Sequence, residues 1–92
     1  MAKSIISNDK ECVRCGCVYD LHKHHIYGGS RRNISEKHGF WMWLCPEHHN
    51  MSDAGIHFNT KFDDLAKKVC QQQFEKKHSH EEFMRLIGKN YI

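Results

Sequence analysis

The chain lacks several features that would assign it at once to a broad class of protein. It contains no apolar run of membrane-spanning length, no signal-peptide pattern at its start, and no internal repeat or low-complexity segment. Its formal net charge is only +3 over 92 residues, which permits nucleic-acid binding without arguing for it. We therefore expect a cytoplasmic protein with no membrane partner, in a compartment where thiols stay reduced.

Metal-ligating side chains, in contrast, are unusually frequent: the chain has five cysteines and nine histidines. In a reducing compartment, the spacing of cysteines indicates metal binding before it indicates disulfides. A chain of this length buries a modest core and often needs a bound metal to stabilise it. The sequence therefore predicts one small domain, spanning residues 1–92, that is held together by a metal ion.

The order of apolar and polar segments predicts an α+β fold. We expect a loose arm over residues 1–10 and a tight knuckle over residues 12–17. A first strand (18–27), a polar loop (31–39) and a second strand (40–44) should follow. Pro46 suits the first position of a helix that runs from Glu47 to about Met51, and Gly55 would end that helix or the loop after it.

The last third of the chain predicts helices within residues 60–88. Two pairs of residues have the spacing of helix-capping boxes: Thr60 with Asp63, and Ser79 with Glu82. Gly88 is expected to end the second helix. Apolar residues recur at helical spacing in both segments, namely Phe62, Leu65, Val69 and Cys70 in the first and Phe83, Leu86 and Ile87 in the second.

Two ligand pairs about thirty residues apart predict a structural zinc site. Cys12 and Cys15 form a Cys-x2-Cys knuckle, and Cys45 and His48 stand three residues apart at a helix start, so each pair can grip one side of a tetrahedral ion. A Cys3His set leaves no coordination position open, so its free energy of binding adds to the free energy of folding. Cys17 competes with Cys12 or Cys15 as a ligand, and the sequence leaves that choice open.

Four further histidines lie near these ligands: His24, His25, His49 and His57. Consecutive residues of a helix face different directions, so His49 should face away from the ion that His48 binds. Neighbouring residues of a flat strand face opposite sides, so His24 and His25 can serve one site only where the strand twists or ends. The remaining histidines are expected to have surface or hydrogen-bonding roles: His22, His38, His78 and His80.

Three motifs together resemble the HNH, or ββα-metal, family of nucleases. They are the Cys12-x2-Cys15 knuckle, the strand end His24-His25-Ile26, and the segment Leu44-Cys45-Pro46-Glu47-His48-His49-Asn50. The resemblance covers residues 12–58 and is closest to small phage-encoded HNH proteins, notably the RecA-dependent nucleases of phage recombination. It implies a zinc-stapled ββα-metal (His-Me finger) core with additional C-terminal helices, in the cytoplasm of a host cell.

The resemblance also implies a role for each of the four histidines. His25 would be the general base, and a catalytic metal ion would be bound by His24, His49 and His57. The chain departs from the family in two ways: residues 40–43 contain no loop-fixing asparagine, and His57 follows His49 by eight residues with Gly55 between them. Two arginines in the loop between the strands are candidates for phosphate binding, although a solvated basic loop explains them equally well: Arg31 and Arg32.

The implied activity is metal-dependent hydrolysis of DNA phosphodiester bonds, giving 5′-phosphate ends, in phage DNA recombination or processing. The cofactors would be a structural Zn²⁺ and one catalytic divalent ion (Mg²⁺, Mn²⁺, Co²⁺ or Ni²⁺), and imidazole ligands favour the transition metals. DNA is the expected partner, delivered by a recombinase or another phage or host protein because few basic clusters give weak affinity. The alternative is a non-catalytic zinc module that binds DNA or a protein, which leaves the other histidines without a shared role.

Overall fold

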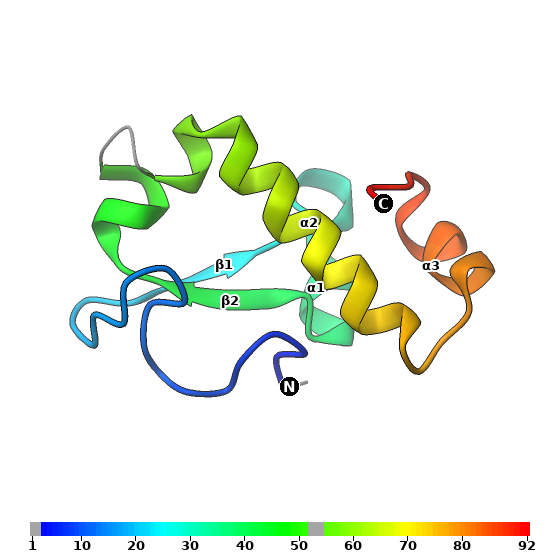
Figure 1. Cartoon of the computed structure of the whole chain (residues 1–92), viewed down its shortest axis with the longest axis horizontal. Coiled ribbons are helices and arrows are strands. Elements are labelled where there is room, and N and C mark those ends of the chain that lie inside the picture. Colours follow the sequence, from blue (N-terminus) through cyan, green and yellow to red (C-terminus); the bar gives the residue numbers. More distant parts are fainter. Residues whose placement is uncertain (1–2, 52–54) are drawn as a thin grey trace.

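The computed structural model describes residues 3–51 and 55–92, except for the side chains of Asn50, Met51 and Phe58. Its regular elements confirm the α+β class (Figure 1). In chain order they are β1 (His22–His25), the 3-10 turn η1 (Gly29–Arg31), α1 (Arg32–His38), β2 (Trp41–Leu44), the π-helical turn η2 (Glu47–Met51), the 3-10 turn η3 (Ile56–Phe58), α2 (Thr60–Glu75) and α3 (His80–Ile87). No helix in the described part combines the length and the apolar composition needed to cross a membrane.

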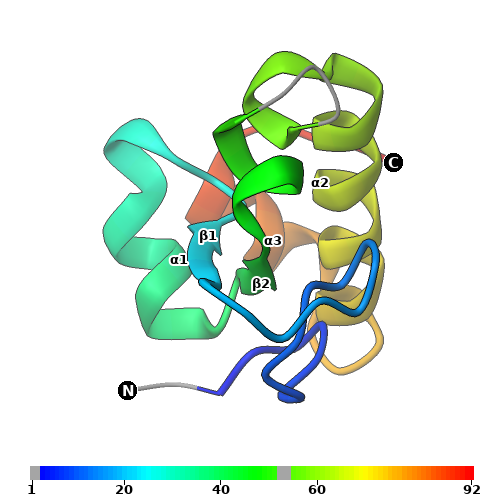
Figure 2. The same cartoon turned by 90° about the vertical axis from the view of Figure 1, so that its left-hand side faces the viewer.

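The two strands form an antiparallel sheet that separates α1 from α2 (Figure 2). His22 pairs with Leu44 and His25 pairs with Trp41, so both strands are only four residues long. The predicted first strand, residues 18–27, is therefore trimmed at both ends. Since the side chains of a strand alternate between faces, the two sides of this short sheet offer two separate environments to the histidines of β1.

The core lies between the sheet and the two C-terminal helices. Phe40, Leu44 and Phe83 are fully buried, and Ile26 is 1% exposed. Aromatic rings meet edge to face in this core, with ring centroids 5.3 Å apart for Phe40 and Phe74, a favoured geometry for aromatic pairs. The core thus fixes both ends of the sheet and, with them, the segments that carry the histidines.

The polar segment 31–39, which the sequence analysis expected to be a loop, instead contains α1. This helix is fixed by one buried polar residue: the Ser35 hydroxyl donates to the Tyr27 carbonyl over 2.8 Å and accepts from the Tyr27 amide over 3.2 Å. Gly39, at a φ of 77°, ends the helix in the left-handed conformation that glycine adopts without strain. Ser35 therefore ties α1 to the segment that follows β1.

The N-terminal segment is not a loose arm over its described residues. The Ser4 hydroxyl donates to the Trp41 carbonyl, and the Ile5 amide donates to the Gly39 carbonyl over 3.0 Å. Further along, the Val13 amide donates to the Trp43 carbonyl over 3.1 Å. These bonds cover the outer edge of β2, which would otherwise expose unpaired carbonyl groups. Residues 1–2 lie outside the described part, as do residues 52–54 of the predicted core.

Helix α2 differs from its prediction in its cap and in its buried face. Its N-cap is Asn59, whose side chain accepts from the Phe62 amide over 3.0 Å, so Thr60 is the first helical residue instead of the cap. Leu65 is 57% exposed, and the residues that face the core are Ala66, Cys70, Gln71 and Phe74. In α3, the predicted cap Ser79 and the predicted stop Gly88 are both confirmed.

Candidate metal centres

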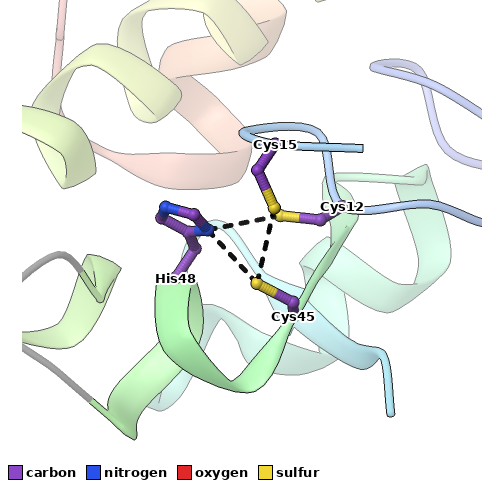
Figure 3. Close-up of side chains that lie close together, drawn as sticks. All are labelled: Cys12, Cys15, Cys45 and His48. Carbon is purple, nitrogen blue, oxygen red and sulfur yellow. Dashed lines mark hydrogen bonds between the residues drawn. The ribbon is translucent and has the colours of Figure 1, made fainter. Parts of the chain in front are cut away.

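Four predicted ligands converge where β2 ends (Figure 3). Cys12 and Cys15 come from the loop before β1, Cys45 directly follows β2, and His48 lies in η2. Their ligand atoms all lie within 4.8 Å of one another. Cys12 and Cys45 are buried, whereas Cys15 lies on the surface, so the group sits at the edge of the core, where it ties the knuckle to the sheet.

The spacing of these atoms fits a tetrahedral zinc ion. The Nδ1 atom of His48 is 3.2 Å from the Cys45 sulfur and 3.8 Å from the Cys12 sulfur, and the Cys15 and Cys45 sulfurs are 3.7 Å apart. Zn–S and Zn–N bonds of ordinary length give tetrahedron edges of about 3.4–3.8 Å. The Cys3His group is therefore compatible with a structural zinc site in both its chemistry and its dimensions.

The pKa values of the two knuckle thiols are shifted in opposite directions. Burial raises the pKa of Cys12, but backbone hydrogen bonds led by that of Cys45 outweigh it and lower this pKa to about 7. A backbone hydrogen bond at Cys17 lowers the pKa of Cys15, but burial and the neighbouring thiols together raise it to about 11. Crowded thiols resist sharing negative charge, and a bound dication removes that resistance because it stabilises every thiolate.

Cys17 lies outside this group, although the sequence left it open as a ligand. Its sulfur contacts the Tyr19 carbonyl at 3.8 Å. Its backbone closes the knuckle, because the Cys12 amide donates to the Cys17 carbonyl over 2.8 Å. Gly16, at a φ of 79°, supplies the left-handed residue of this turn. The turn therefore directs Cys12 and Cys15 toward Cys45 and leaves Cys17 pointing elsewhere.

A second group of possible metal ligands consists of His24 in β1, His49 in η2 and His57 in η3. Their ligand nitrogens lie within 4.8 Å of one another. The Nε2 atoms of His49 and His57 are 3.0 Å apart, and the His24 ring lies 5.4 Å from that of His49 and 5.2 Å from that of His57. His49 and His57, although eight residues apart, can approach each other because they lie in two separate turns, η2 and η3.

His24 is the least solvated member of this group. It is only 6% exposed, and its Nε2 atom has no hydrogen-bond partner among the described residues. Burial, followed by the charges of His49 and His57, lowers its pKa to about 3. Burial likewise lowers the pKa of His49. A buried polar atom without a partner is costly, and a neutral imidazole nitrogen is a ligand for transition metals, so a metal ion would satisfy this atom.

One short turn supplies a ligand to each group. The amides of His48 and His49 both donate to the Cys45 carbonyl, over 3.1 and 2.9 Å. Their imidazoles nevertheless diverge: His48 joins the three cysteines, and His49 joins His24 and His57. The residues are consecutive in a π-helical turn, a rare form that is frequent at functional sites, and their side chains project at different angles from the turn axis.

His25 faces the other side of β1, toward α1. Its Nε2 atom lies 2.7 Å from an oxygen of Glu36, which also accepts from Lys23 over 2.9 Å. Even so, His25 lines the same cavities as His24 and His57, one of about 250 Å³ and one of about 270 Å³. This sharing is possible because β1 ends at His25, so the last side chain of the strand borders space that is open to both faces.

Two residues of this region were not singled out by the sequence analysis. His22 was expected to have a surface or hydrogen-bonding role, and its Nδ1 atom lies 2.8 Å from Nδ1 of His49, a contact that would hold that ring in place. Glu36 was overlooked because it belongs to a segment expected to be a loop. The sequence did carry a signal for His22: it stands two residues from His24 on the same strand, so the two side chains share one face of β1. No comparable signal marked Glu36.

The two candidate phosphate-binding arginines have different surroundings. Arg31 donates through Nε to the Ile87 carbonyl over 2.9 Å and through Nη1 to the Ser30 hydroxyl over 3.2 Å. It therefore ties η1 to the end of α3. Arg32 is exposed and lines a cavity together with His24, His25 and His49, where a phosphate would be within its reach.

No protein-family model, curated protein or solved structure matches the chain. What the chain can do must therefore be argued from these side chains. Three imidazoles, of which the buried His24 is kept neutral at ordinary pH, can hold a transition metal ion with coordination positions left for other ligands. A fourth imidazole, paired with a carboxylate, borders the same space. This combination is suited to metal-assisted hydrolysis.

Proposed function

We propose that the chain is a metal-dependent endonuclease that hydrolyses DNA phosphodiester bonds, with the ββα-metal arrangement of the HNH nucleases. The observation that carries the proposal is the convergence of His24, His49 and His57 beside His25 and its partner Glu36. A zinc module that only binds DNA or protein needs the Cys3His group alone. Such a module has no use for a second imidazole group with an unpaired buried nitrogen.

The order of the elements supports the ββα-metal assignment. One strand carries His24 and His25, the second strand leads into Cys45, and the helical turn that follows carries His48 and His49. Two strands and a helical turn thereby surround one candidate metal site, and a structural ion at the Cys3His group would hold the turn against the sheet. His24 would hold the catalytic ion from a strand that is paired with β2, which favours precise geometry.

Each side chain has a part in the proposed reaction. His25 accepts a proton from the attacking water at its unprotonated ring nitrogen. His24, His49 and His57 would hold a metal ion, which would supply Lewis-acid stabilisation of the negative charge that develops during hydrolysis. Arg32 contacts the phosphate on the open side of the cavity. We further propose that a recombinase or another phage or host protein delivers the DNA, because the net charge is only +3.

The proposal is tested by plasmid cleavage with the zinc-loaded chain. We expect nicked or linear products with Mn²⁺, Co²⁺ or Ni²⁺ at least as readily as with Mg²⁺, because imidazole ligands favour transition metals. Products should carry 5′-phosphates that DNA ligase can rejoin. His25→Ala should lower the cleavage rate by about 100-fold or more, the contribution expected of a general base.

The matched control is His80→Ala, which removes an exposed histidine on α3 that pairs with Glu75. It should cleave at the wild-type rate, and both variants should retain zinc and a cooperative unfolding transition. Undiminished cleavage by His25→Ala would remove His25 as the base. Absence of cleavage by the wild-type chain with every metal and DNA form tested would favour the zinc-module alternative, and activity with Mg²⁺ alone would count against the three imidazole ligands.

A further inference from the structure

On the α1 side of the sheet, one carboxylate binds two side chains of β1. Glu36 accepts from Lys23 Nζ at Oε1 over 2.9 Å, and its Oε2 lies 2.7 Å from Nε2 of His25. The His25 side chain is 15% exposed and that of Glu36 is 37% exposed. The hydrogen bond from Lys23, followed by that from His25, lowers the pKa of Glu36, so this carboxylate is ionised at neutral pH.

The position of Glu36 is set by the residue before it. Ser35 is fully buried and holds both the amide and the carbonyl of Tyr27 through its hydroxyl. This contact ties the first half of α1 to the backbone two residues after His25. Lys23, whose ammonium group lies 4.3 Å from the centre of the Trp41 ring, fixes the other carboxylate oxygen. The His25–Glu36 contact therefore belongs to an anchored network.

We propose that Glu36 is the positioning residue of His25, holding the imidazole in the tautomer in which Nε2 carries the proton and Nδ1 carries the lone pair. An ionised carboxylate can only accept hydrogen bonds, so the ring nitrogen that faces it must donate. In the neutral form of the ring the second nitrogen is then the acceptor, and it belongs to a ring that lines the cavity next to His24 and His57. The catalytic consequence rests on the proposed endonuclease function, whereas the tautomer is a property of the chain itself.

The tautomer is tested by nuclear magnetic resonance of the zinc-loaded full chain labelled with ¹⁵N in its histidines. At a pH high enough for the ring to be neutral, the wild-type His25 ring should show a protonated Nε2, with a downfield proton protected from solvent by Glu36, and an unprotonated Nδ1. In Glu36→Gln the amide can accept or donate, so the protected proton should disappear and the two nitrogen shifts should move toward each other. A ring protonated at Nδ1 in the wild type, or ring signals unchanged in the variant, would overturn the proposal.

Steady-state cleavage provides the second readout. Glu36→Gln should lower kcat by about 100-fold while KM changes little, because a misoriented base weakens the chemical step and leaves DNA binding in place. A rise in KM with unchanged kcat would show that Glu36 serves substrate binding instead, which would also overturn the proposal. The matched control is Glu82→Gln, which breaks a histidine–glutamate pair of similar length on α3, at 3.0 Å from His78. It should leave both kcat and the His25 signals unchanged.

The two measurements separate failure of this inference from failure of the proposed function. If the wild-type chain cleaves no DNA but His25 shows the expected tautomer, and that tautomer depends on Glu36, the positioning contact stands and the nuclease assignment falls. If DNA is cleaved and Glu36→Gln changes neither the ring signals nor kcat, the nuclease stands and the positioning role falls. Retained zinc content and cooperative unfolding exclude misfolding of the variant as the cause of any loss.

Discussion

Among the histidines of the described residues, His24 is the most buried, and it has an unusual chemical state. It stays neutral because the low-dielectric surroundings oppose its charge, and its pKa of about 3 lies far below the ordinary value of 6.5. For a protein with a proposed metal centre, this neutrality has a practical value. Protons do not compete with a metal ion for this nitrogen at any pH at which the chain is expected to work.

The low pKa of His24 predicts a specific pH dependence of stability. Below pH 6.5 the unfolded chain takes up a proton at this position and the folded chain does not, so the free energy of unfolding falls as the pH falls toward 3. In the window from pH 6.5 to 5.5, this contribution is up to about 1.4 kcal/mol per pH unit. Urea titrations of the zinc-loaded chain should therefore show a steeper loss for the wild type than for His24→Leu.

The control for this measurement is His80→Leu, which replaces an exposed histidine and should keep the wild-type slope. Zinc content should be checked at each pH, because protonation of the thiols would release the ion and lower stability for another reason. If His24→Leu and the wild type lose stability in parallel, the histidine at this position is not held neutral.

The grouping of side chains was predicted more successfully than their hydrogen-bond partners. Residue spacing predicted the Cys12, Cys15, Cys45 and His48 group, the family resemblance implied the His24, His49 and His57 group, and the side chains of each group lie close together in the structure. The contacts of His22 and Glu36 were not expected. The contact of His22 depends on the face of β1 that it occupies. The contact of Glu36 depends on α1, a helix that a tertiary contact of Ser35 holds in place. Spacing along the chain predicts neither.

Among the elements, the junction between α1 and β2 is the most tightly constrained. Gly39 adopts a left-handed φ of 77°, and a Cβ atom built on it would lie 2.1 Å from the Lys3 carbonyl oxygen. That close approach exists because the N-terminal segment pairs with Gly39 through Ile5. Three separate segments of the chain therefore meet at one glycine, which has no side chain to keep them apart.

Replacement of this glycine should destabilise the chain markedly. Gly39→Ala should lower the free energy of unfolding by at least about 2 kcal/mol, because the left-handed conformation alone costs a non-glycine residue roughly 1–2 kcal/mol and the clash with Lys3 adds to it. Gly28→Ala is the matched control: Gly28 has a φ of −88° and nothing within 4 Å of the added carbon. Chemical denaturation should find the control within about 0.5 kcal/mol of the wild type. Equal effects of the two changes would contradict this account.

Element prediction succeeded where one residue type decides the local structure and failed where contacts decide it. The cap at Ser79 and the stop at Gly88 follow from the chemistry of those residues and were expected. Helix α1 has little apolar character, and its stability comes from Ser35 holding Tyr27, so a pattern of polar residues suggested a loop. In the same way, the N-terminal segment has no period of its own, and it is ordered by the edge of β2.

For the whole molecule, the small core leads us to expect that folding depends on a bound metal ion. The fully buried side chains are few, and the sheet has only two strands of four residues. The Cys3His group joins the loop before β1 to the turn after β2, two segments that are distant in sequence. A structural zinc ion can contribute about 10–16 kcal/mol in small peptides, comparable to the whole stability of an ordinary domain.

Loss of a zinc ligand should therefore cost the molecule its fold. Cys12→Ser should bind less than one zinc ion per chain at the Cys3His group and should lose the near-ultraviolet circular dichroism of its two tryptophans at 25 °C. Cys17→Ser, which changes a cysteine outside the group, should keep both the ion and the signal. Zinc content by mass spectrometry and circular dichroism check both expectations. Full structure in Cys12→Ser, or zinc loss in Cys17→Ser, would show that the ligand set is different.

The turn η2 also limits how this protein can change over generations. Because neighbouring residues of that turn each belong to a different candidate metal site, inserting or deleting one residue there would misdirect both side chains in a single event. A substitution at one of these positions, in contrast, can change the ligand set of one candidate metal site and leave the other site unchanged. Descendants of this chain should therefore vary in ligand type at these two positions far more readily than in the number of residues between Cys45 and His49.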